Sequence, residues 1–233
     1  MPFYFMFDST FIFIIIGLVL SALASSYVQS TFNKFSKTRN QNGYTAWEAA
    51  RMILDNAGLQ QVEMDRIKGN LTDNYDSSNK ILRLSEATYN STSVSAIGVA
   101  AHEAGHAIQD KEAYVPLKIR SALVPVTNFG QGVSMPLILV GILFGYNQSL
   151  INLGILFFSL TFLFQIVTLP VEFNASRRAL VILEQQHLLS TDELGQARQV
   201  LRAAALTYVA GAIASFLQVL RLVLLFGGGN RRD

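Results

Sequence analysis

Four long apolar segments constrain the fold of this 233-residue chain more than any other feature. They cover about residues 9–26, 122–144, 150–169 and 203–226. Each is long enough to cross a hydrocarbon core of about 30 Å as an α-helix. The fourth is the weakest, because Gln218 and Arg221 interrupt it. With 51% hydrophobic and only 15% charged residues, the chain is too apolar for an ordinary soluble domain and is expected to lie in a membrane.

The positions of the cationic residues predict an orientation in that membrane. No Lys or Arg precedes Lys34, so the first segment lacks the positive start of a signal peptide and is expected to be a retained anchor. Residues 34–120 carry eleven Lys and Arg, residues 171–202 carry four, and residues 145–149 carry none. This distribution places 34–120 and 171–202 on the cytoplasmic side of the cell's inner membrane. Arg231 and Arg232 are a contrary signal, because four full spans would leave them outside.

The residues between the first two segments have the composition of a small α+β domain. Thr45 and Glu48 have the spacing of a capping box, and Gly58 is a stop signal, so a helix is expected between them. Residues 61–69 and 80–86 alternate like half-buried strands, and 70–79 reads as a strand running into a turn. We expect these strands to form a small antiparallel sheet. A helix should follow from about residues 91–93 to 111, and another should open at 190–193.

The stretch "VAAHEAGHAIQD", residues 99–110, lies in the first of those two helices. On a helix His102 and His106 lie one turn apart on the same face, with Glu103 beside them. Such a pair can be two ordinary core histidines, but the intervening glutamate completes the His-Glu-x-x-His arrangement that binds zinc and supplies a general base. Gly105 is unfavourable inside a helix, which suggests that another element packs closely there. Cysteine is absent, so any zinc must use His, Asp or Glu.

A catalytic zinc typically has three protein ligands, so a third must come from elsewhere in the chain. Asp110 follows His106 by one turn but should lie too far along the helix, and His187 sits in a polar stretch that reads as exposed. Glu172 is the better candidate: it follows the third apolar segment, just inside a helix that Pro170 should restart. The alternative for Glu172 is an ion pair with one of the two arginines at 177 and 178.

Several separated blocks of the sequence resemble the YugP-type neutral zinc metallopeptidases of bacterial membranes. The blocks are "LTDNYD", "LRLSE", "VAAHEAGHAIQ", "RSALVPVTN", "LPVEFNASRRA" and "VLRAAALTYVA", in that order. The chain is more distantly similar to the HtpX and CAAX-prenyl protease group, whose third ligand is the Glu of a Glu-x-x-Ala-Asp motif. In "EFNAS", Glu172 and Ala175 match that motif, but Ser176 stands where the group has Asp. The resemblance implies Glu172 as a ligand and leaves Ser176, Asn174 or another acid to orient a zinc histidine.

These observations predict a mainly α membrane protein with about four transmembrane helices and a small α+β zincin-like catalytic domain. The expected parts are an anchor (1–30), the α+β metallopeptidase domain (31–120), a transmembrane hairpin (121–170), a third-ligand segment (171–202) and a last transmembrane helix with a basic tail (203–233).

The expected activity is hydrolysis of peptide bonds by an integral membrane zinc endopeptidase, a member of the gluzincins. Zn²⁺ held by His102, His106 and Glu172 would activate water, and Glu103 would take its proton as general base. Arg177 and Tyr208 are candidates for stabilising the oxyanion, although a structural role is the more common one for such residues. A substrate peptide is expected to add as a strand beside residues 80–86.

The sequence admits two other classes of function. A membrane scaffold or chaperone-like protein with a structural metal would leave Glu103 without a role. A transporter is suggested by Asn128, Gln131 and Gln165, but no internal repeat or pair of broken helices supports it. The expected partners are the bilayer and membrane-associated protein or peptide substrates. A net charge of +2 without a basic stripe gives no argument for nucleic acid, and the sequence leaves the oligomeric state open.

Overall fold

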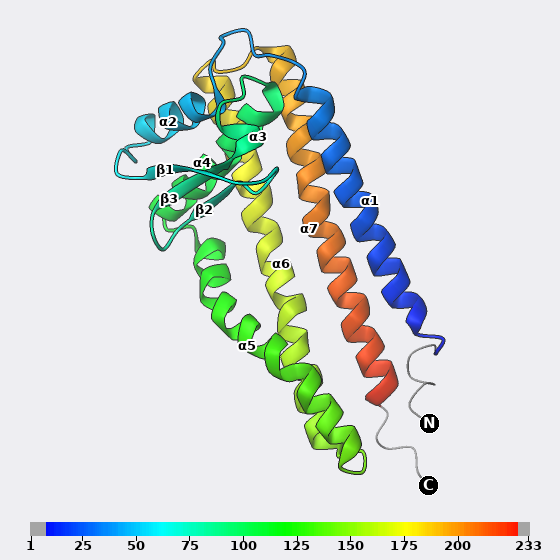
Figure 1. Ribbon diagram of the computed structural model, residues 1–233. Helices are drawn as coiled ribbons and strands as arrows, with labels where there is room; N and C mark the ends of the chain where they lie inside the picture. Colours follow the sequence, from blue (N-terminus) through cyan, green and yellow to red (C-terminus); the bar gives the residue numbers. More distant parts are fainter. Residues whose placement is uncertain (1–7, 228–233) are drawn as a thin grey trace. The chain divides into compact units, whose positions relative to one another are not determined.

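The structure is a computed structural model that describes residues 8–227 (Figure 1). Along this part of the chain the elements are α1 (Phe11–Phe35), α2 (Ala46–Asn56), β1 (Glu63–Ile67), β2 (Asn74–Asp76), β3 (Ile81–Ser85), α3 (Glu86–Tyr89), α4 (Val94–Lys111), α5 (Val115–Leu143), α6 (Gln148–Gln185) and α7 (Thr191–Phe226).

Four of these helices, α1, α5, α6 and α7, are long and apolar enough to cross a membrane. Only 6–28% of the residues in their most apolar windows are buried inside the protein. Helices with that much outward apolar surface suit a lipid environment and would be unfavourable in water. The expected mainly α membrane fold with four candidate spans and a small sheet is confirmed.

The chain divides into two compact units. The apolar unit comprises the chain up to Ala24, Ile119–Leu169 and the chain from Thr207. The sheet-bearing unit comprises Ser25–Lys118 and Pro170–Leu206, and it contains every residue of the candidate site described below.

The capping box predicted at Thr45 and Glu48 is present, and α4 begins close to its predicted start at residues 91–93. The Thr45 side chain accepts a hydrogen bond from the Glu48 amide, and the Glu48 carboxylate accepts one from the Thr45 amide. The Ser93 hydroxyl accepts a hydrogen bond from the Ala96 amide and so fixes the start of α4. Capping satisfies amides that would otherwise lack a partner at the helix start.

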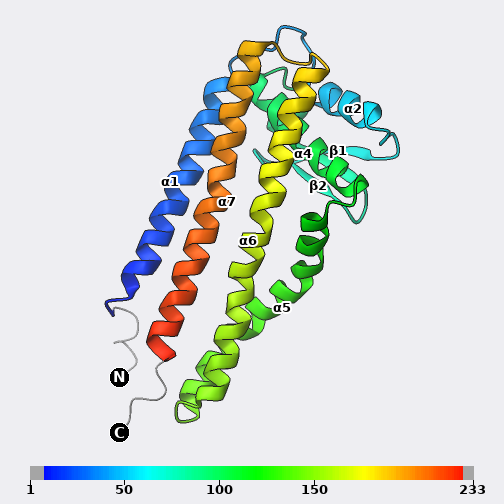
Figure 2. The same cartoon turned by 180° about the vertical axis from the view of Figure 1, so that it is seen from behind.

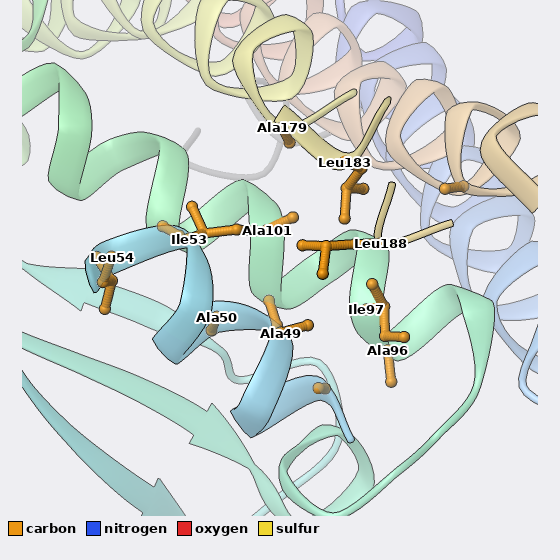
Figure 3. Packing of buried hydrophobic residues seen from close by; sticks show 14 of the residues in the cluster. Ala49, Ala50, Ile53, Leu54, Ala96, Ile97, Ala101, Ala179, Leu183 and Leu188 are labelled. Atoms are coloured by element: carbon orange, nitrogen blue, oxygen red, sulfur yellow. The ribbon is translucent and has the colours of Figure 1, made fainter. Parts of the chain in front are cut away.

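One hydrophobic core joins α2, α4, the sheet and the end of α6 (Figure 3). Ile53 of α2, Ile97 of α4 and Leu183 of α6 are each fully buried in it. Figure 2 shows from behind that α4 lies between the sheet and the C-terminal part of α6. The core therefore holds α4 from both sides.

The sheet is mixed, so the expectation of a purely antiparallel sheet is wrong. Its order is β1-β3-β2, with β3 parallel to β1 and antiparallel to β2. β3 takes the centre because Leu82 and Leu84 are fully buried, whereas β2 has three half-buried residues and β1 has none that is buried. β1 and β3 run in the same direction, so they form a parallel pair once β3 occupies the centre beside β1.

α6 continues through Pro170, so the expectation that this proline restarts a helix is also wrong. A proline inside a helix removes one backbone hydrogen bond, and α6 tolerates that loss at Pro170. α7 likewise continues from Thr191 into the fourth apolar segment without a break. At its start the Glu193 carboxylate accepts from the Ser190 amide at 2.8 Å, whereas the Ser190 hydroxyl has no hydrogen-bond partner, so only half of the expected capping box forms.

Candidate metal centre

α4 presents the two histidines of the sequence motif to one point. Their ring centroids are 4.7 Å apart and the rings stand at 83° to each other. The side chain of His102 is 12% exposed and that of His106 is 9% exposed, so both rings are largely shielded from solvent. The neighbouring alanines of α4 are fully buried.

Glu172 of α6 faces both rings. Its Oε2 atom lies 3.2 Å from His102 Nε2 and 3.5 Å from His106 Nε2. The potential ligand atoms of the three residues all lie within 4.8 Å of one another, close enough for one metal ion. Glu172 is 2% exposed, and a buried carboxylate beside two imidazoles is the donor set that suits a catalytic zinc. The structure thus brings together the three residues that the sequence analysis selected.

A close approach between α4 and α6 makes this meeting possible. A methyl group added at Gly105 would lie 2.8 Å from the carbonyl oxygen of Ala175. Real Cβ atoms do not come so near a backbone oxygen, so only glycine allows the two helices to pack at this distance. Ala175 lies one helical turn after Glu172, and Gly105 directly precedes His106. The expectation that an element packs closely on Gly105 is confirmed.

The ring nitrogens that point away from the metal position have partners of their own. The Ser176 hydroxyl lies 3.1 Å from His102 Nδ1, in the place where the related proteases are expected to have Asp. The Gln109 amide oxygen lies 3.0 Å from His106 Nδ1. Such partners orient a metal-binding imidazole and fix which nitrogen carries its proton.

The contacts of Gln109 determine the tautomer of His106. The Gln109 amide nitrogen donates to Val171 O and to Asn174 Oδ1, both at 2.9 Å. Its Oε1 atom must therefore face the imidazole and accept a hydrogen bond from Nδ1–H, since an amide oxygen can only accept. In the neutral ring, His106 Nε2 then carries the lone pair that a metal ligand requires.

The sequence analysis did not select Gln109 as a site residue. The structure shows that its side chain is fully buried. A signal was present: the residue follows His106 by three positions, so it lies on the same face of the helix. The sequence analysis left Asn174 as one possible residue to orient a zinc histidine. Asn174 Oδ1 accepts a hydrogen bond from the Gln109 amide and another from Arg178 Nε at 2.7 Å, so it reaches His106 only through Gln109. Ser176 contacts His102 directly.

Glu103 is 8% exposed and lies between the histidines in sequence. Burial raises the pKa of Glu103 above its ordinary value, and the nearby His102 and His106 oppose this shift in part. A carboxyl group with a raised pKa can accept a proton near neutral pH and give it back, which is what a general base needs.

The other candidates from the sequence lie away from the three ligands. The Asp110 carboxylate accepts a hydrogen bond from the Tyr75 hydroxyl at 2.8 Å and pairs with Lys80. His187 is exposed in the connection between α6 and α7. Neither belongs to the three-residue group that can hold a metal, among the residues that the structure describes.

The arginines near Glu172 have other surroundings. Arg178 forms a 2.7 Å ion pair with Glu112, which removes it as the alternative partner of Glu172. Arg177 is exposed and lines a separate cavity. Tyr208 belongs to the apolar unit. An oxyanion role for Arg177 or Tyr208 stays a prediction.

The expected strand addition beside residues 80–86 is wrong. β3 is the central strand of the sheet, so β1 and β2 already pair with its two edges. A peptide can add only to a free edge, because its backbone groups need unpaired partners.

Comparison with known proteins agrees with this donor set. The model of a family described as "Putative neutral zinc metallopeptidase" matches residues 10–227. The chain is 46% identical over 221 residues to "Putative membrane protease YugP" of Bacillus subtilis (strain 168), covering 94% of this chain and 98% of the relative. No solved structure matches. The family is one of zinc-dependent hydrolases, and the buried group of His102, His106 and Glu172 can bind such an ion. By both comparisons, the chain belongs to the neutral zinc metallopeptidase family.

Proposed function

We propose that this protein is an integral membrane zinc endopeptidase of the gluzincin type that cleaves membrane-associated proteins. The observation that carries the proposal is the meeting of His102, His106 and Glu172 beside the buried Glu103. Two imidazoles and one carboxylate give zinc three protein ligands and leave a position for a reactant.

In this proposal each residue of the site has a separate task. His102 Nε2, His106 Nε2 and a Glu172 carboxylate oxygen would hold zinc, and the bound ion would supply a Lewis acid for water and for a carbonyl group. Ser176 and Gln109 hold the two rings in orientation through their Nδ1 atoms. The ligands come from two helices, so the packing at Gly105 keeps them in register.

Glu103 acts as the general base and then as the general acid. It accepts a proton from the attacking water and delivers it to the amine that leaves when the peptide bond breaks. Its burial favours the protonated form more than in solvent, which makes Glu103 a stronger base toward the attacking water.

Glu103→Gln tests this assignment because it removes the base and spares the three ligands. We expect a zinc content equal to that of the wild type and hydrolysis of casein about 10²–10⁴-fold slower. Glu86→Gln, at an exposed glutamate of α3, is the matched control and should leave both quantities unchanged.

Full activity of Glu103→Gln would overturn its role as base. A wild-type protein that binds zinc but hydrolyses no protein would favour the alternative of a membrane scaffold that retains a structural metal.

The proposal places the protein in the cell's inner membrane with the zinc site facing the cytoplasm. It rests on the fifteen Lys and Arg in residues 34–120 and 171–202 and on their absence from 145–149. Since the chain has no native cysteine, single cysteines at Ser78 and Asn147 report their sides directly. An impermeant thiol reagent should label Asn147→Cys in intact cells and Ser78→Cys only after permeabilisation. Labelling of both from one side would contradict the topology.

A further inference from the structure

A cavity of about 660 Å³ lies in the sheet-bearing unit, outside the group of candidate ligands. Its wall is formed by Tyr27 of α1, by residues of α6 from Phe173 to Glu184 and by residues of α7 from Arg198 to Leu206. The volume suits part of a large ligand. Apart from Ser176, which orients His102, no residue of its wall has a part in the proposed peptidase mechanism.

Three arginines give this cavity a positive charge. Arg177, Arg198 and Arg202 line it together with a single acid, Glu184. Among the described residues, none of these three guanidinium groups takes part in an ion pair or a side-chain hydrogen bond. Unpaired guanidinium groups collected in one hollow are suited to an anion, above all to a phosphate group.

The remainder of the wall is apolar and open. Tyr27 is 51% exposed, Phe173 49%, Leu206 48% and Val181 43%, although all four line a hollow of the protein. Large exposed apolar side chains around a concave site indicate a ligand or partner that covers them. The cavity therefore combines cationic and apolar surface.

On α7 the apolar and cationic surfaces are separated along the helix, whereas on α6 Arg177 lies between Phe173 and Val181. Tyr27 and Phe173 follow closely after the first and third apolar segments, and Leu206 lies at the start of the fourth. Arg202 and Arg198 lie about 6 Å and about 12 Å farther along α7, at 1.5 Å per residue, on the side away from its apolar segment. The apolar end is thus next to the membrane-spanning stretches and the cationic end is beyond them, which is the order of chain and headgroup in a lipid.

The position of Ser176 argues against a second part of the substrate site. Ser176 lines the cavity and contacts His102 at Nδ1, whereas Glu172 faces Nε2 of the same ring. The cavity thus adjoins the side of His102 that points away from the position of the metal. A peptide bond held in this cavity would lie behind the ligand, not over it.

We propose that this cavity binds an anionic phospholipid of the surrounding bilayer. The phosphate is held by Arg198 and Arg202, with Arg177 nearby, and the upper acyl chains lie on the exposed apolar side chains around Phe173 and Leu206. Basic pockets between membrane helices are suited to anionic headgroups, and each cation near the membrane surface contributes about a fivefold gain in affinity.

Native mass spectrometry of the full chain in detergent tests the proposal, with dioleoylphosphatidylglycerol and dioleoylphosphatidylcholine as probes. We expect the wild type to retain the anionic lipid in preference to the zwitterionic one. The double variant Arg198→Gln/Arg202→Gln should bind phosphatidylglycerol about 25-fold more weakly and phosphatidylcholine unchanged. Both side chains are exposed and unpaired, so the variant should fold, which circular dichroism and zinc content check.

The matched control is Arg66→Gln/Lys68→Gln, which removes the same charge from exposed positions at the end of β1. It should bind both lipids as the wild type does. Equal loss in the control, unchanged binding in Arg198→Gln/Arg202→Gln, or equal retention of the two lipids would overturn the proposal. Displacement of the lipid by an equal concentration of sn-glycerol 3-phosphate would show a site for a free phosphate compound, and displacement by casein would show a substrate site. Both results contradict a lipid site, and neither depends on whether the chain hydrolyses peptides.

Discussion

Three polar residues of α4, His102, His106 and Asp110, follow one another at intervals of four and share one face of the helix. The first two converge with Glu172 of α6, whereas the third binds Tyr75 of β2 and Lys80. Helical spacing is the same for all three. Their roles differ because α6 covers the first two positions and the sheet covers the last.

The two ends of this face also differ in burial. Glu172 and Gln109 are almost completely buried, and their polar atoms find partners within the protein. The Asp110 side chain is 24% exposed and its partner Lys80 is 51% exposed. Leaving a buried polar group without its partner costs about 1–3 kcal/mol, whereas an exposed ion pair contributes about 0–1 kcal/mol. Substitutions should therefore have large effects at the α6 end and small ones at the sheet end.

The largest effect on the metal end is expected from Gly105→Val. The new side chain meets the carbonyl oxygen of Ala175 at the closest point of α4 and α6, and backbone cannot yield as a flexible side chain can. Overpacking of this kind costs about 1–3 kcal/mol, and the displacement of α6 moves Glu172 from the histidines. We expect both the melting temperature and the zinc content to fall.

Gly195→Ala is the control for this substitution. Gly195 also lies inside a helix, but an added Cβ there meets no atom within 4 Å. Alanine should be neutral or stabilise by up to about 1 kcal/mol, with unchanged zinc content. If the valine at position 105 is tolerated as well as the alanine at 195, close packing does not hold the site together.

The next effect concerns the residues behind the imidazoles. Gln109→Ala removes the acceptor for His106 Nδ1 and leaves Val171 O and Asn174 Oδ1 without the donor they have now. Zinc affinity, measured by competition with a chromogenic chelator, should fall about 10–100-fold. Ser176→Ala should act in the same direction through His102, whereas Ser176→Asp should keep or raise affinity by restoring an acceptor. Unchanged affinity in both alanine variants would show that the rings are oriented by packing alone.

At the sheet end, Asp110→Asn is expected to leave zinc affinity and hydrolysis as they are. It weakens the contacts with Tyr75 and Lys80, which join α4 to the sheet. For a partly exposed pair the melting temperature should fall by no more than about 3 °C. Loss of zinc on this substitution would mean that the two ends of α4 are not separate in function.

The smallest effect is a pH dependence in the turn after β2. Hydrogen bonds from Asn79, with Arg83 and Ser78, lower the pKa of Asp76 from its ordinary 3.8 to about 2. A lowered pKa means that the carboxylate stabilises the fold fully above 3.8 and that this contribution is lost as the pH falls toward 2. The melting temperature of the wild type minus that of Asp76→Asn should be at most about 2 °C, equal at pH 7 and pH 5, and smaller at pH 3. A melting-temperature difference at pH 3 that equals the difference at pH 5 would contradict the lowered pKa of Asp76.

Local signals in the sequence predicted the parts of the fold that depend on neighbouring residues. The caps at Thr45 and Ser93 and the apolar lengths of the four long helices follow from short patterns. The order of the sheet did not follow, because it depends on which strand the helices bury. The continuity of α6 through Pro170 runs against the local preference of proline, so neighbouring residues did not predict it. The domain limits at residues 30, 120, 170 and 202 stay predictions.

The candidate site shows the same division. The spacing of His102 and His106 indicates a metal, and Glu172 required the resemblance of "EFNAS" to a known ligand motif as well as the expected topology. Gln109 was overlooked because its role depends on Val171 and Asn174, which the fold brings to it from 62 and 65 residues away. No pattern within one helix reports a hydrogen bond of that kind.

The measurement that tests the central claim most directly is zinc X-ray absorption spectroscopy of the purified wild type, Glu172→Ala and His187→Ala. The wild type should show two imidazole nitrogens and a carboxylate oxygen within about 2.2 Å of one zinc ion per chain. Glu172→Ala should lose most of its zinc and all hydrolysis of casein, and His187→Ala should be indistinguishable from the wild type. Full zinc occupancy with an unchanged spectrum in Glu172→Ala, or loss of a nitrogen ligand in His187→Ala, would contradict the assignment of the three ligands.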